Sequence, residues 1–111
     1  MTIRERVKTI NTELRDGDVT PQMARDHLVT LTALIGNIHD EVRDSELDYK
    51  QVLLGALQSE TKANRARMVA ECSVEYRRHR EAKDTATQVQ ELIRTCRAYL
   101  RSLDEEMRLQ R

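Results

Sequence analysis

A single helical seam, which runs from Leu28 to Ser73, most constrains what this chain can fold into. Its positions recur at alternating spacings of three and four residues, the pattern of an α-helix that packs along one face. They are Leu28, Leu31, Ile35, Ile38, Val42, Ser45, Tyr49, Val52, Ala56, Ser59, Ala63, Ala66, Ala70 and Ser73. From Ala56 onward the seam holds only Ala and Ser. The seam predicts an all-α fold, an elongated antiparallel helical hairpin or coiled coil with a short N-terminal helix.

The composition supports one thin helical domain over residues 1–111. The chain has no Trp or Phe, one Pro and three Gly, and 34% of its residues are charged. A core without these aromatic residues must be built from Leu, Ile, Val and Ala between helices. No apolar run reaches the length of a membrane span, and the N-terminus lacks a signal-like apolar segment. We expect a soluble, cytoplasmic protein with no membrane partner.

Capping residues predict the ends of the first helix, residues 1–16. Thr2 and Glu5 have the spacing of a capping box. Gly17, between two Asp residues, is expected to close this helix in the left-handed conformation. The chain then restarts at Thr20-Pro21, with Thr as the cap and Pro at the first helical position.

Residues 20–83 are expected to form one long helix. Two breaks remain open as alternatives, near position 45 where Ser45 and Asp48 resemble a cap, and near Gly55. The seam loses its apolar character after Ser73, and a new frame starts at Ala86. We therefore predict a turn near residues 83–85 and a final helix, residues 85–111, that folds back.

The predicted hairpin packs residues 46–83 against residues 86–111. Small seam residues would face large ones of the final helix, because large and small side chains interlock across helical layers. The large residues are Ile93, Leu100, Leu103 and Met107. The earlier part of the seam would then remain for the first helix and another subunit. We expect an apolar partner-binding site there, made of Leu28, Leu31, Ile35 and Ile38.

The charges are segregated along the chain although the total is zero. Residues 21–61 carry three basic and seven acidic groups, and residues 62–83 carry seven basic and three acidic groups. One hypothesis is that the acidic patch of one protomer contacts the basic patch of another and so sets how the two protomers align. The acidic patch is Asp40, Glu41, Asp44 and Asp48, and the basic patch is Arg77, Arg78 and Arg80. A second is a nucleic-acid contact through Lys62, Arg65, Arg67, Arg77, Arg78, Arg80 and Lys83. The third is a solvated helix face.

The sequence favours a protein that is not an enzyme and holds no cofactor or metal. The three His residues are scattered and the Gly residues are isolated. Asp40, Asp44 and Asp48 share a helical face that resembles the metal site of all-α nucleotide pyrophosphohydrolases, but the second acidic helix of those enzymes is missing. Cys72 and Cys96 are expected to be reduced residues packed between helices.

The segment from Glu60 to Leu109 resembles, in its texture, small coiled-coil accessory proteins of tailed phages. The resemblance rests on Lys62-Ala-Asn-Arg-Ala-Arg67, Glu75-Tyr-Arg-Arg-His-Arg-Glu-Ala-Lys-Asp84, Glu91-Leu-Ile-Arg94 and Leu100-Arg-Ser-Leu103. It implies an accessory or inhibitor protein in the host cytoplasm. We expect a homo-oligomer that binds a protein partner through the apolar site and the charge patches. The alternative is a nucleic-acid-binding accessory protein of DNA recombination or replication that uses residues 62–83.

Overall fold

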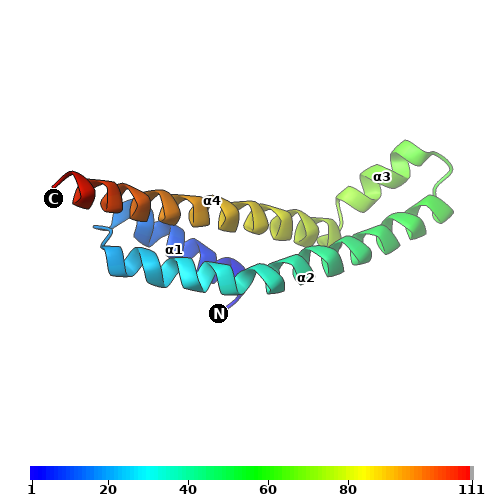
Figure 1. The fold of residues 1–111 in the computed structure, drawn as a ribbon. Coiled ribbons are helices and arrows are strands. Elements are labelled where there is room, and N and C mark those ends of the chain that lie inside the picture. Colours follow the sequence, from blue (N-terminus) through cyan, green and yellow to red (C-terminus); the bar gives the residue numbers. More distant parts are fainter. Residues whose placement is uncertain (111) are drawn as a thin grey trace. The chain divides into compact units, whose positions relative to one another are not determined.

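The computed structural model describes residues 1–110 and contains four helices and no strand among them. The helices are α1 (Ile3–Asp16), α2 (Pro21–Ser59), α3 (Ala63–Glu71) and α4 (Val74–Leu109) (Figure 1). The chain divides into two compact units, which we call unit 1 (residues 1–36 and 87–110) and unit 2 (residues 37–86). Both α2 and α4 contribute to each unit. The predicted all-α fold with a short N-terminal helix is confirmed.

No helix of the described residues has the length and apolarity needed to cross a bilayer.

Local caps set the helix starts that the sequence predicts. The Glu5 amide donates to Thr2 Oγ1 at 3.2 Å, and the Thr2 amide donates to the Glu5 carboxylate at 3.4 Å. The Met23 amide donates to Thr20 Oγ1 at 3.1 Å, just before Pro21 enters α2. Both predicted helix starts are therefore confirmed.

Gly17 closes α1 in a different way from the one predicted. Its φ is −101° and its ψ is 165°, which is extended backbone and not the left-handed conformation. Its amide donates to the Glu13 carbonyl at 3.1 Å. A Cβ at this position would lie 2.8 Å from the Glu13 carbonyl oxygen. Glycine is needed here because the Glu13 carbonyl leaves no space for a Cβ atom. The dihedral angles themselves would be open to any residue.

The long helix predicted over residues 20–83 is wrong, because α2 ends at Ser59 and α3 occupies residues 63–71. Neither open alternative holds, since α2 passes through Ser45 and Gly55 without a break. The Ser45 hydroxyl donates to the Val42 carbonyl at 3.0 Å, so this side chain bonds within the helix and starts no new one.

The turn predicted at residues 83–85 is also wrong, since α4 runs unbroken from Val74 to Leu109. The Thr85 hydroxyl donates to the Glu81 carbonyl at 2.8 Å inside the helix, where a cap was expected. The cap lies at Ser73 instead: its Oγ accepts from the Tyr76 amide at 3.1 Å and donates to the Ala70 carbonyl at 2.6 Å. One hydroxyl thus serves the end of α3 and the start of α4.

Unit 1 is held by a core of apolar side chains from three helices, most of them large and aliphatic. They are Val7 and Ile10 of α1, Ala24, Leu31 and Leu34 of α2, and Val89, Leu92, Ile93 and Cys96 of α4. Polar contacts tie the margins of this core. The Tyr99 hydroxyl donates to the Val19 carbonyl at 2.7 Å, and His27 Nε2 lies 2.8 Å from a Glu13 carboxylate oxygen. Burial of each Leu or Val contributes about 1.5–3 kcal/mol.

Unit 2 is an antiparallel pairing of residues 37–59 of α2 with residues 74–86 of α4, joined by α3. Successive contacts show the direction: Ser45 meets His79, and further along α2 Tyr49 meets Tyr76. The predicted partners of the Ala/Ser half of the seam are wrong, because Ile93, Leu100, Leu103 and Met107 belong to unit 1. Ala66 and Ala70 of α3 are instead buried within unit 2.

The two cysteines are expected to differ sharply in reactivity. Cys72 is exposed between α3 and α4, against the expectation of a packed residue, whereas Cys96 is buried in unit 1. Burial raises the pKa of the Cys96 thiol, so less of the reactive thiolate forms at a given pH. A disulfide reagent should modify Cys72 of the native protein rapidly and Cys96 only after denaturant is added. Two rapidly reacting thiols in native buffer would contradict the buried position of Cys96.

Candidate interaction surface

In unit 2 most of the fully buried residues are small, and several large apolar side chains are exposed. Its buried residues are Ile38, Ser45, Ala56, Ala66, Ala70, Ala82 and Thr85, of which Ile38 alone is a large aliphatic residue. Six of the ten exposed large hydrophobic residues among residues 1–110 also lie in this unit. They are Leu47, Leu54, Leu57, Met68, Val69 and Val74. The apolar surface available for binding is therefore concentrated in unit 2.

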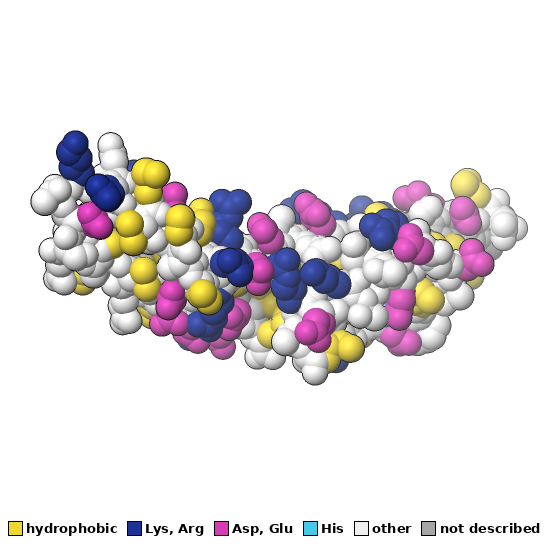
Figure 2. Space-filling model, turned by 180° about the vertical axis from the view of Figure 1, so that it is seen from behind, with side chains coloured by type: hydrophobic (Ala, Val, Ile, Leu, Met, Phe, Trp, Pro, Cys, Tyr) yellow, Lys and Arg dark blue, Asp and Glu magenta, His cyan; other side chains and the backbone are white. Residues whose placement is uncertain are grey.

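Leu47, Leu54 and Leu57 form a stripe on the outer face of α2, which we call the leucine stripe. Their separations of seven and three residues place them on one helical face. Their side chains are 55%, 57% and 45% exposed. Figure 2 shows hydrophobic side chains gathered over the surface formed by the end of α2 and α3. Met68 and Val69 of α3 are also exposed.

The apolar partner site predicted from the seam is largely core. Leu31 in unit 1 and Ile38 in unit 2 are 0% and 3% exposed. Leu28 and Ile35 are half-buried. Periodicity marks the face that packs, and here that face packs on the chain's own helices. Leu31 and Ile38 therefore cannot present an apolar surface to a partner.

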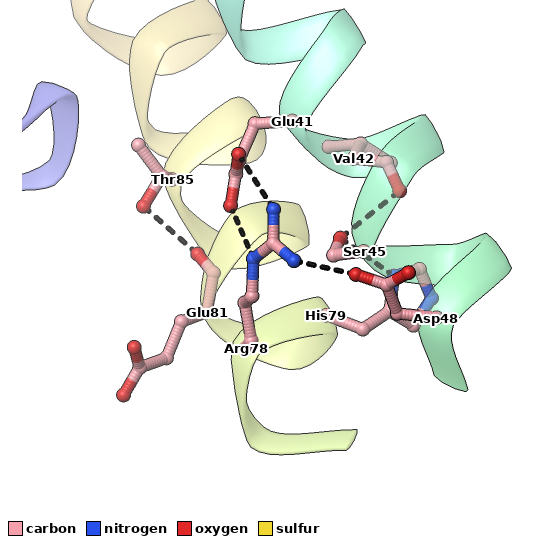
Figure 3. A network of polar contacts seen from close by, with 8 residues as sticks. All are labelled: Glu41, Val42, Ser45, Asp48, Arg78, His79, Glu81 and Thr85. Atoms are coloured by element: carbon pink, nitrogen blue, oxygen red, sulfur yellow. Dashed lines mark hydrogen bonds and ion pairs between the residues drawn. The ribbon is translucent and has the colours of Figure 1, made fainter. Parts of the chain in front are cut away.

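Arg78 connects the two long helices inside unit 2 (Figure 3). Its Nε and Nη2 donate to the two carboxylate oxygens of Glu41 at 2.9 and 3.2 Å, and Nη1 donates to Asp48 at 2.7 Å. Hydrogen bonding to Glu41, then the charge of that carboxylate, raises the pKa of the Arg78 guanidinium. The acidic and basic groups predicted to meet between protomers thus meet, at these three residues, within one chain.

The other two acidic residues of this group, Asp40 and Asp44, are also paired locally. Arg43 Nη2 lies 3.4 Å from Asp40, and its Nε lies 3.5 Å from Asp44. Among residues 1–110 no group of three or more His, Cys, Asp or Glu side chains is placed to hold a metal ion. The four carboxylates therefore pair with two arginines, Arg43 and Arg78.

Ser45, His79 and the two tyrosines form a packed polar cluster beside Arg78. Ser45 is fully buried, and its Oγ lies 3.4 Å from His79 Nδ1. The His79 ring stacks on Tyr49 with 6.1 Å between centroids, and Tyr49 contacts Tyr76 at 5.1 Å. Burial raises the pKa of the Tyr49 phenol. Because Ser45 donates its hydrogen to Val42, its oxygen can accept from the His79 ring, and the pair fastens α2 to α4.

The other predicted nucleic-acid residues remain on the surface of unit 2. Lys62, Arg65 and Arg67 lie on or next to α3, and Arg77, Arg80 and Lys83 lie on α4, all of them exposed. Arg65 Nε lies 3.6 Å from Glu60, and Arg80 donates to the Tyr76 hydroxyl at 3.5 Å. Unit 2 therefore carries both the apolar surface and the exposed basic groups.

Comparison of the chain with protein-family models, curated proteins and solved structures found no match. The leucine stripe was missed at the sequence level because its residues lie off the main seam. The signal was nevertheless present, as Leu47, Leu54 and Leu57 have helical spacing.

Replacing Arg78 by Ala is expected to destabilise the protein slightly and in a salt-dependent way. The guanidinium is 44% exposed, so solvent weakens its two ion pairs, and the expected loss is about 0.5–1 kcal/mol. Urea unfolding at low and high salt measures it, and the difference from the parent protein should shrink at high salt. Arg77→Ala is the matched control on the exposed face. Equal effects of the two variants would contradict the role of the Glu41–Arg78–Asp48 contacts.

Proposed function

We propose that this chain is a non-enzymatic helical interaction protein that self-associates and binds a protein partner through unit 2. The observation that carries the proposal is the inverted apolar distribution of this unit. Several large apolar side chains exposed on one unit are typical of a surface that binds another protein. An accessory or inhibitor role, as the phage-like texture implies, is consistent with such a surface.

The charge pairs support assigning the binding energy to apolar contacts. Glu41 and Asp48 already hold Arg78, and a second molecule would have to break these bonds to use them. The leucine stripe, Met68 and Val69 need no such rearrangement, because they are already exposed. Burial of apolar area is the main favourable term in most protein association. The charge patches then tune orientation at the margins.

Sedimentation velocity over a wide range of protein concentrations tests self-association. The weight-average mass should rise with concentration and change little with salt, because apolar contacts dominate. A monomer at every concentration would overturn the self-association part of the proposal. Mass that collapses to the monomer in high salt would show instead that charge drives assembly.

Nucleic-acid binding is a second candidate, favoured by one observation. The exposed Lys62, Arg65, Arg67, Arg77, Arg80 and Lys83 all lie in one unit, so several could contact a single phosphate backbone. Arg78 is excluded from this set because Glu41 and Asp48 occupy its guanidinium. The neutral total charge and the few aromatic residues weigh against this function.

Fluorescence anisotropy with single- and double-stranded oligonucleotides at two salt concentrations tests this candidate. The double variant Arg77→Glu with Arg80→Glu should bind at least tenfold more weakly at low salt. The control is Arg6→Glu with Lys8→Glu, two exposed residues of α1 in unit 1, which changes the net charge by the same amount. Absence of binding by the parent protein at low salt would remove this function. Equal losses in both double variants would show attraction by net charge alone.

A further inference from the structure

We infer that the solvent-facing side of α4 in unit 1 binds the phosphate backbone of duplex DNA through Arg94, Arg97 and Arg101. These residues lie in unit 1, so this surface is separate from the basic groups of unit 2. The inference rests on the second candidate function, nucleic-acid binding, and names a face and a form of nucleic acid for it. It does not depend on the proposed protein partner of unit 2.

The three arginines lie on one face of α4, which we call the arginine face. Their separations of three and four residues place successive side chains about one helical turn apart. The buried residues of the same part of α4 are Val89, Leu92, Ile93 and Cys96. All three arginines are exposed, because they lie on the side of the helix opposite these buried residues. The arginine face is therefore open to a ligand along its whole length.

The positive charge of the arginine face is not compensated by carboxylates. Residues 92–103 contain the three arginines and no Asp or Glu, and the nearest acidic residues of α4 are Glu91 and Asp104. Within the described residues 1–110, none of the three guanidinium groups takes part in an ion pair. An anion can therefore bind the arginine face without breaking an existing ion pair, which it could not do at Arg78.

The composition around the arginines favours a phosphate-bearing partner over an apolar one. Apart from Glu91, the other exposed residues of α4 between positions 87 and 102 are Thr87, Gln90, Thr95, Ala98 and Ser102. They are small or polar, whereas a protein interface has an apolar centre and a membrane-bound helix has large apolar side chains beside its basic ones. Arginine binds phosphate oxygens with two parallel N–H donors. A nucleic-acid backbone supplies such oxygens at regular intervals.

The aromatic residues and the helix geometry favour duplex DNA among nucleic acids. Single-strand sites stack bases on aromatic side chains. The aromatic residue of this segment, Tyr99, is half-buried and donates its hydroxyl to the Val19 carbonyl at 2.7 Å. A helix is about 10–12 Å across, and the major groove of B-form DNA is about 12 Å wide. The major groove of duplex RNA is too narrow for side chains to enter.

Fluorescence anisotropy of a labelled DNA duplex tests the arginine face, with the full chain and its triple variant Arg94→Gln, Arg97→Gln, Arg101→Gln. The three side chains are exposed, so helicity by circular dichroism should be retained. The variant should bind at least tenfold more weakly at low salt. The slope of log Kd against log salt concentration should be shallower by about 2–3, because each lost phosphate contact removes about 0.9.

The matched control removes the same charge from other exposed positions of unit 1. It is the triple variant Arg6→Gln, Lys8→Gln, Arg25→Gln, on α1 and α2. It should bind the duplex as the parent protein does, with the same salt dependence. Equal weakening by the control would show attraction by net charge and would overturn the assignment to the arginine face.

The remaining outcomes separate this inference from the candidate function on which it rests. If the parent protein does not bind the duplex at low salt, both are overturned. If the parent and the arginine variant bind equally well, the arginine face is not the site. Loss of binding by Arg77→Glu with Arg80→Glu would then leave the nucleic-acid candidate standing in unit 2. A single strand or an RNA duplex of the same sequence that binds as tightly as the DNA duplex overturns the choice of partner.

Discussion

Replacing Leu31 by Asp is expected to unfold unit 1. Leu31 is among the largest fully buried side chains of the protein, at 0% exposure. The substitution removes its apolar contacts and buries a carboxylate among Val, Leu and Ile side chains. Loss of the leucine alone costs about 2–5 kcal/mol, and the buried charge adds to this. Urea unfolding followed by circular dichroism should show the early loss of the helical signal.

Val29→Asp is the matched control, two residues away on the same helix. Val29 is 70% exposed, so the change in unfolding free energy should stay within about 0.5 kcal/mol. A Leu31→Asp protein with normal stability and a reduced mass would contradict the core position. That result would support the sequence-level hypothesis that Leu31 binds another subunit.

The parts of the fold that were predictable from sequence are those set by local hydrogen bonds. Thr2 and Thr20 cap their helices because a hydroxyl finds an amide three residues on, whatever the rest of the chain does. The break at residues 60–62 has no comparable signal. Lys62, the cap of α3, makes no side-chain bond to the helix end, and the segment contains neither Gly nor Pro. Tertiary packing of α3 must determine this break.

The candidate site was predicted less well, because periodicity does not say which molecule covers a face. Leu31 and Ile38 have the spacing of an interface and turn out to be core. The charge pattern correctly identified complementary groups, but Glu41 and Arg78 are 37 residues apart in sequence and meet inside one unit. Whether such groups pair within a chain or between chains depends on where the helices turn. The sequence predicted one turn, at residues 83–85, whereas the chain turns at residues 60–62 and again at residues 72–73.

Replacing Ala70 by Leu is expected to destabilise unit 2 by about 1–3 kcal/mol. Ala70 is 0% exposed, as is Ala66 one turn earlier, so α3 approaches its neighbours at its small residues. Three extra carbon atoms have no space there unless α3 moves away. We expect an earlier urea transition, together with faster amide exchange in α3, since a displaced helix opens more readily.

Ala63→Leu provides the control, because Ala63 lies on the same helix and is exposed. Its stability should differ from that of the parent by no more than about 0.5 kcal/mol. A neutral or stabilising Ala70→Leu would mean that unit 2 has room for large residues in its interior. Lack of interior space would then not explain why the large apolar residues of unit 2 are exposed. The argument that they form an interaction surface would be weaker. Destabilisation at Ala70 alone would instead show that unit 2 is closely packed around small residues, which leaves its leucines to face another molecule.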